Sequence, residues 1–159
     1  MKKNRPNINA KSKKLDMKWI RTPEVIWESL SKEFNFTVDA CASDKNHLLP
    51  KYWTINNSAL DQNWDNEVVY CHPMYDIYIP KFVKKAVESK CLTVFLLPSS
   101  TNAAYFHEYF YKKPNVDVRF LKRHHTGTGH KFFSDDNEEP KCGYLRPLMV
   151  VVVDNRKVI

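Results

Sequence analysis

The stretch 68–75, with the sequence VVYCHPMY, decides how the chain folds. Three residues of strong strand propensity and a small cysteine lead into a rigid turn, His72-Pro73-Met74-Tyr75. A buried strand that ends in such a turn places side chains at the carboxyl edge of a sheet, where open α/β folds bind ligands. An acceptor imidazole, a fixed carbonyl and a flat aromatic ring there suit a planar ring that bears an amino group. An ordinary strand and loop with a surface aromatic residue fits the same pattern.

Apolar runs on both sides of this stretch predict an α/β fold. Residues 36–43 form a short strand that runs into small residues, and residues 91–97 are almost fully apolar, as expected of a parallel strand covered on both faces. Residues 116–121 and 148–153 are two further strands. We therefore expect a three-layer domain around a largely parallel sheet.

Helical periodicity separates these strands. The first helix spans 22–35, with Thr22 as its N-cap and Pro23 in the first helical position. An amphipathic helix is expected over 79–90 and a third over 100–111. The order strand, helix, strand, helix predicts a βαβ unit with a right-handed crossover.

The net charge of +7 is concentrated at the amino end of the chain. Residues 1–21 hold eight Lys and Arg and a single acid, so the other 138 residues hold equal numbers of bases and acids. We divide the chain into a basic flexible arm, 1–18, and one domain, 19–159. Such an arm is typical of a disordered segment that contacts a polyanion, although a solvated tail that aids solubility has the same composition.

Cysteine spacing and hydropathy argue against other classes of protein. The four cysteines, Cys41, Cys71, Cys91 and Cys142, are far apart and form no CxxC pair, so neither a zinc site nor a disulfide framework is indicated. No apolar run approaches the roughly 20 residues of a membrane span. We expect a cytoplasmic protein with reduced thiols, no metal and no membrane partner.

The end of the first predicted strand is a second candidate site. Asp39 stands near its carboxyl end, and the small residues 40–43 keep the turn low enough for a ligand to approach. The same residues fit a strand capped by a turn-forming Asp. Further along, 122–131 is a basic, hydroxylated loop that contains glycine.

Taken together, these segments resemble the phage-type DNA N6-adenine methyltransferases, the Dam-like family. The resemblance covers 19–153 and rests on six short pieces in the order of the family. These are Thr22-Pro23, the strand end 36–43, Ala59-Leu60 followed by Trp64, the turn His72-Pro73-Met74-Tyr75, Leu96-Leu97-Pro98, and Tyr105-Phe106-His107. The resemblance implies a Rossmann-like methyltransferase fold, in a cytoplasmic protein whose compartment is the host-cell cytoplasm if a phage encodes it.

The resemblance also implies a pocket for S-adenosylmethionine between the ends of the strands at 36–43 and 68–71. Asp61 would bind the adenine amino group of this cofactor, while Asp44 is a weaker candidate for its ribose. The methionine part would contact Thr22, Pro23, Asp39, Ala40, Cys41, Ala42 and Ser43. Double-stranded DNA, with the target adenine flipped out, would contact Lys11, Lys13, Lys14, Lys122, Arg123, His124, His125 and Lys131.

The catalytic turn departs from the family pattern, Asn-Pro-Pro-Tyr. Here His72 replaces Asn and Met74 replaces the second Pro, while Pro73 and Tyr75 are kept. Neutral imidazole has one acceptor nitrogen, so we expect His72 to accept a hydrogen bond from N6 of adenine or to act as a base. Because a free imidazole has a pKa of about 6.5, activity is expected to rise with pH through that value.

Three functions remain open on the sequence. The first is an active N6-adenine methyltransferase with a variant turn. The second is a relative without activity that binds DNA, cofactor or a host protein, and the replacement of Asn by His72 favours it. The third is methylation of RNA or of a protein amide.

Overall fold

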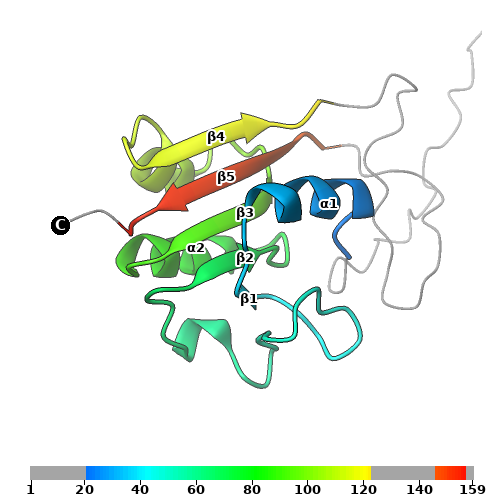
Figure 1. Ribbon diagram of the computed structural model, residues 1–159. Helices are drawn as coiled ribbons and strands as arrows, with labels where there is room; N and C mark the ends of the chain where they lie inside the picture. The colour runs from blue at the N-terminus through cyan, green and yellow to red at the C-terminus, as the bar shows by residue number, and fades with distance from the viewer. Residues whose placement is uncertain (1–20, 123–145, 157–159) are drawn as a thin grey trace, which may run out of the picture.

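The computed structural model describes residues 21–122 and 146–156, which form an α/β domain built on a five-stranded sheet (Figure 1). Residues 1–20, 123–145 and 157–159, which include the expected basic arm, lie outside the described residues. The strand order is β1-β2-β3-β5-β4. The strands are β1 (Val38–Asp39), β2 (Val68–Cys71), β3 (Leu92–Pro98), β4 (Val116–Phe120) and β5 (Leu148–Asp154).

The sheet is mixed rather than largely parallel. Strands β1, β2 and β3 pair in parallel, whereas β5 is antiparallel to both of its neighbours, β3 and β4. Four strands therefore point one way, and half of the pairings are antiparallel. The sequence did not reveal this because a strand buried on both faces is apolar whatever its direction.

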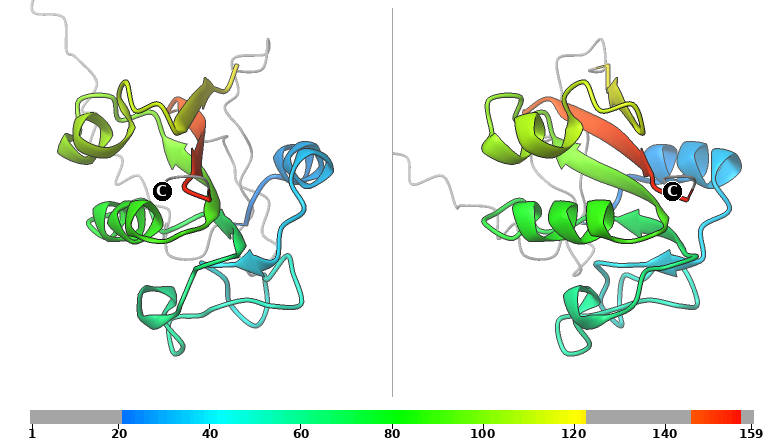
Figure 2. Two further views of the ribbon diagram at one scale, coloured as in Figure 1. Left: turned by 60° about the vertical axis from the view of Figure 1, so that its left-hand side comes forward. Right: turned by 90° about the vertical axis from the view of Figure 1, so that its left-hand side faces the viewer.

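Helices cover both faces of the sheet, so the three layers are confirmed (Figure 2). Helix α1 (Glu24–Glu33) packs Ile26 and Leu30 on one face. Helix α2 (Ile79–Glu88) and the short π-helix η3 (Phe106–Phe110) pack on the other. The third helix is thus much shorter than the span 100–111 that was expected. Between the layers, every residue of β3 is buried.

Helix α1 begins differently from the prediction. Pro23, rather than Thr22, occupies the N-cap position, and no side chain caps the helix. The hydroxyl of Thr22 instead lies 2.7 Å from the hydroxyl of Tyr70 on β2. The prediction was wrong because Thr22 forms a hydrogen bond with a residue far along the chain, and local sequence spacing does not reveal such a partner.

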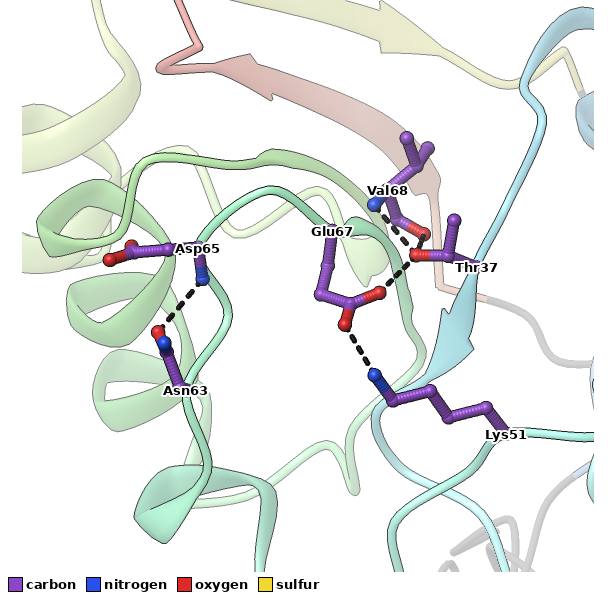
Figure 3. A network of polar contacts seen from close by, with 6 residues as sticks. All are labelled: Thr37, Lys51, Asn63, Asp65, Glu67 and Val68. Atoms are coloured by element: carbon purple, nitrogen blue, oxygen red, sulfur yellow. Dashed lines mark hydrogen bonds and ion pairs between the residues drawn. The ribbon is translucent and has the colours of Figure 1, made fainter.

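Strand β1 is shorter than the predicted 36–43 because two polar clusters hold its ends. At its start, the Thr37 hydroxyl accepts from the Val68 N–H at 2.9 Å and contacts Glu67, which also pairs with Lys51 (Figure 3). At its end, the Asp39 carboxylate accepts backbone N–H groups of the following turn. These contacts tie β1 to β2 and turn the chain toward the site.

A short helix within the long loop after β1 completes the described elements. This is the 3₁₀ helix η2 (Ala59–Asp61), which lies just before Trp64. In residues 21–122 and 146–156, no helix is long and apolar enough to cross a membrane. The same residues contain no group of three or more His, Cys, Asp or Glu side chains that could hold a metal ion.

Candidate active site

A cavity of about 250 Å³ lies where the carboxyl ends of β1 and β2 meet the loop after β1. This is the edge at which parallel α/β sheets bind ligands. Its walls come from four segments: the turn after β1, the loop that carries η2, the turn after β2, and the start of α2. The lining residues are Ala40, Cys41, Ala42, Asn46, Trp53, Thr54, Ile55, Ser58, Ala59, Leu60, His72, Pro73, Met74, Tyr75, Tyr78 and Phe82.

Among the described residues that line the cavity there is no Asp, Glu, Lys or Arg. Aromatic rings and small apolar groups dominate it, with a few amide and hydroxyl groups between them. Buried tryptophans fix the loop wall: the Trp64 ring stacks on Trp53, and its Nε1–H donates to the Ala59 carbonyl at 2.8 Å. The Ser58 side chain caps η2 by accepting the Leu60 N–H. The cavity is therefore a rigid, mostly apolar site with few polar contacts.

All four residues of the turn after β2 line this cavity. Pro73 is buried and the other three are half-buried. The Tyr75 ring is tilted against His72, with ring centroids 5.3 Å apart, and packs against the apolar clusters on both faces of the sheet. The sheet edge thus brings His72, Pro73 and Tyr75 together at one cavity.

Both ring nitrogens of His72 have hydrogen-bond partners. Nδ1 lies 3.1 Å from Thr22 Oγ1, and Nε2 lies 3.0 Å from the Tyr75 hydroxyl. Thr22 in turn contacts the hydroxyl of Tyr70, which is buried. A polar chain therefore runs from the interior of β2 through Thr22 and the imidazole to the cavity.

Burial lowers the pKa of His72 to about 4, because desolvation disfavours the charged ring. The imidazole is therefore neutral at physiological pH. The expectation of a titration near 6.5 was wrong, since it took the value of a solvated histidine.

The predicted cofactor residues fall into two groups. Ala40, Cys41 and Ala42 line the cavity. Thr22, Pro23, Asp39, Ser43 and Asp61 do not, and neither does Asp44. The three residues that line the cavity are small and lie at the end of β1, so they let a ligand approach the backbone closely.

Asp39 organises the turn instead of facing the cavity. Its carboxylate accepts the Leu48 N–H at 3.1 Å and the Cys41 N–H at 3.4 Å, and its side chain is buried. Desolvation raises the pKa of Asp39 to about 6, although the two backbone N–H groups act against this shift. Asp61 is exposed at the end of η2. Asp39 therefore stabilises the turn after β1, which was the alternative to a role in ligand binding.

Two thiols meet beside the cavity. Cys41 Sγ lies 3.6 Å from Cys71 Sγ, and both residues are free cysteines. Desolvation raises the pKa of the buried Cys71 well above its ordinary value, so this thiol stays protonated.

Several lining residues were not predicted, chiefly in the loop after β1. They are Asn46, Trp53, Thr54, Ile55, Ser58, Ala59, Leu60, Tyr78 and Phe82. The aromatic residues in the polar stretch 44–64 indicated that this loop contributes to an apolar site, because aromatic rings in a loop pack against apolar groups. Phe82 lies within the amphipathic helix expected over 79–90, but the cavity beside it follows from the tertiary packing.

Of the residues predicted to contact DNA, the structure describes Lys122. Lys122 is exposed just beyond β4. Arg123, His124, His125 and Lys131, together with Lys11, Lys13 and Lys14, lie outside the described residues.

The chain matches the sequence profile of a known protein family. The sequence profile of the family described as DNA N-6-adenine-methyltransferase (Dam) matches residues 9–157, which is nearly the whole chain and includes every residue of the cavity. The match begins within the basic segment. A search of curated proteins found no match.

Proposed function

Because the chain belongs to the Dam family of DNA N-6-adenine-methyltransferases, we propose that it methylates N6 of adenine in double-stranded DNA, with S-adenosylmethionine as the methyl donor. One observation carries this proposal: the turn 72–75 and the turn 40–42 line the same cavity. A donor held at the end of β1 and a base held at the end of β2 would then meet there. The target adenine must leave the duplex to reach it.

The cavity lining fits S-adenosylmethionine. Small side chains over 40–42 allow close approach of the ligand to the backbone, and Trp53 and Tyr78 offer aromatic faces to a sulfonium cation. Asn46 and Ser58 supply amide and hydroxyl groups for the polar atoms of a nucleoside. When bound, S-adenosylmethionine supplies an electrophilic methyl group.

The turn after β2 suits the amino group of adenine. The N6 lone pair is delocalised into the ring, so the amine is a poor nucleophile until its hydrogens are held and polarised. The Pro73 carbonyl accepts from one N6–H, the Tyr75 ring stacks on the base, and His72 contacts the Watson–Crick edge. Positioning and polarisation of this kind supply most of the rate enhancement.

Substrate binding requires a local rearrangement in this turn. The Tyr75 hydroxyl lies 3.0 Å from Nε2 of His72, where an atom of the base would have to sit. Tyr75 must therefore turn away from the imidazole as the base enters. Met74 replaces a proline in this family turn, and its flexible side chain removes one restraint on that movement.

The contact between His72 and Tyr75 also favours a second candidate function. If the ring stays locked by Tyr75, the protein is a relative without activity that binds DNA or cofactor. Such a protein would keep the cavity and lose the chemistry.

The deciding experiment measures N6-methyladenine in DNA. The protein is expressed in cells that lack adenine methylation, and the digested DNA is examined by mass spectrometry. We expect N6-methyladenine with the wild type and a large loss with Tyr75→Ala. Tyr111→Ala, which removes an exposed ring outside the cavity, should leave the modification unchanged. Methylation by His72→Asn but not by the wild type would identify a relative without activity.

A further inference from the structure

The polar chain behind His72 begins at a rigid tyrosine. The Tyr70 ring packs edge-on against the stacked rings of Trp27 and Phe36, with ring centroids 5.1 and 5.4 Å away. Desolvation raises the pKa of Tyr70 well above its ordinary value, so its hydroxyl keeps its proton. Among the residues that the structure describes, this hydroxyl contacts Thr22 Oγ1 at 2.7 Å and no other hydrogen-bonding group.

The hydrogen bonds between Tyr70, Thr22 and His72 determine which nitrogen of the imidazole carries its proton. A buried hydroxyl hydrogen without an acceptor costs about 1 to 3 kcal/mol, so the Tyr70 O–H donates to Thr22. The Thr22 O–H then finds its acceptor at Nδ1 of His72, 3.1 Å away. A neutral imidazole carries one proton, which must therefore be on Nε2.

The alternative tautomer leaves one hydroxyl hydrogen without an acceptor in the part of the chain that the structure describes. If Nδ1 carries the proton and donates to Thr22, the Thr22 hydroxyl has two choices. Donation to Tyr70 leaves the Tyr70 hydrogen without an acceptor in the described part of the chain. Acceptance from both neighbours leaves the hydrogen of the half-exposed Thr22 hydroxyl to solvent alone. The arrangement with Nε2–H is the one in which both hydroxyl hydrogens have acceptors among the described residues.

We propose that Thr22 and Tyr70 are positioning residues that hold the proton of His72 on Nε2, so that His72 meets the target base as a hydrogen-bond donor. This inference rests on the proposed function for its substrate. It reverses the acceptor role expected of His72 from the sequence, and it gives Thr22 a role in the base site instead of the cofactor site.

The donor role matches the chemistry of adenine. On its Watson–Crick edge, adenine offers a hydrogen on N6 beside an acceptor at N1. The Pro73 carbonyl accepts from N6, and Nε2–H of His72 donates to N1. The two groups thus offer adenine an acceptor and an adjacent donor. Thymine pairs with adenine through the same pattern. His72 thus serves recognition, and the Pro73 carbonyl serves polarisation of the amine.

Nitrogen NMR of the histidine rings tests the tautomer without any substrate. The six histidines are labelled with ¹⁵N, and His72 is assigned by its absence from the His72→Asn spectrum. We expect a protonated Nε2 and a bare Nδ1 in the wild type. Thr22→Val keeps the shape but loses the hydroxyl, so it should shift the tautomer, whereas Thr22→Ser should restore the wild-type pattern. A proton on Nδ1 in the wild type, or an unchanged pattern in Thr22→Val, would overturn the proposal.

A base analogue tests the donor role in methyl transfer. A duplex whose target is 1-deazaadenine lacks N1, so the wild type should transfer methyl to it about threefold to tenfold more slowly, the effect of one hydrogen bond. The penalty should shrink in Thr22→Val and persist in Thr22→Ser. An equal penalty in all three proteins would contradict donation to N1. If no protein methylates either duplex, the proposed function fails, while the NMR result still decides the tautomer.

Discussion

At the scale of single residues, the surroundings of His72 decide its chemistry. The imidazole is the one titratable catalytic candidate that differs from the usual turn of the family, and both of its nitrogens are engaged. Because burial lowers its pKa to about 4, its charge does not change over the physiological range.

The pH profile of methyl transfer follows from this shift. Protonation of His72 sets in only as pH falls toward about 4, so His72 should add no step to single-turnover rates between about pH 5.5 and 8.5. His72→Asn should therefore differ from the wild type in rate and not in the shape of this profile. A step near pH 6.5 that vanishes in His72→Asn would show that the ring is solvated.

At the scale of elements, Asn155 joins the last strand to helix α2. It follows β5, is buried, and its Nδ2 lies 3.0 Å from the carbonyl oxygens of both Ala86 and Val87. The last carbonyls of a helix have no partner within the helix, so this side chain caps the carboxyl end of α2. The cap holds in place the helix whose amino-terminal turns line the cavity.

Removal of this cap should destabilise the protein. Asn155→Ala leaves buried carbonyls without donors, and we expect the free energy of unfolding to fall by about 2 to 3 kcal/mol. Lys84→Ala, which breaks an exposed ion pair with Glu88 on the same helix, should cost less than about 0.5 kcal/mol. Urea unfolding followed by circular dichroism measures both. Equal effects of the two substitutions would exclude the cap as a source of stability.

At the scale of the whole molecule, two groups with shifted pKa values, Asp39 and His72, give stability opposite dependences on pH. The pKa of Asp39 is raised to about 6, so its contribution is present at low pH and is lost as pH rises through about 6. The pKa of His72 is lowered to about 4, so its contribution is present above the pKa of the unfolded chain and is lost as pH falls toward about 4. Between about pH 4 and 6, rising pH removes the stabilising contribution of Asp39 and restores that of His72.

Single substitutions should separate these contributions. Relative to the wild type, Asp39→Asn should gain stability with rising pH between about 4 and 6, because it lacks the group that loses stability there. His72→Asn should show the opposite trend over the same range. Urea midpoints measured at several pH values give both slopes, and parallel curves for the wild type and both variants would contradict the assigned shifts.

The distribution of charge predicts how the whole protein binds DNA. If about four of the eight bases in residues 1–21 meet phosphates, deletion of residues 1–18 should flatten the slope of log K against log[salt] by about 3 to 4. Methyl transfer at saturating DNA should hardly change. An unaltered slope would identify the segment as a solubility tail.

Much of the fold and half of the site could be predicted from local sequence. The turn 72–75 and the small residues 40–42 were found because a strand that ends in a Pro-containing or small-residue turn has a pattern that can be recognised in a few residues. The loop wall around Trp53 was missed, because irregular backbone has no period. Asp39 was assigned to ligand binding although its carboxylate turns back to the backbone, since a carboxylate at a strand end suits either role.

The sequence by itself determined the strands, the helices, the layers and the turn that faces the cavity, because propensity and periodicity act over neighbouring residues. Only the tertiary structure decided the direction of β5, the partners of Asp39 and the tautomer of His72. Thr22 and His72 are 50 residues apart in the chain and 3.1 Å apart in space. A hydrogen bond depends on that distance and on which groups are buried with it, and both arise only when the layers pack.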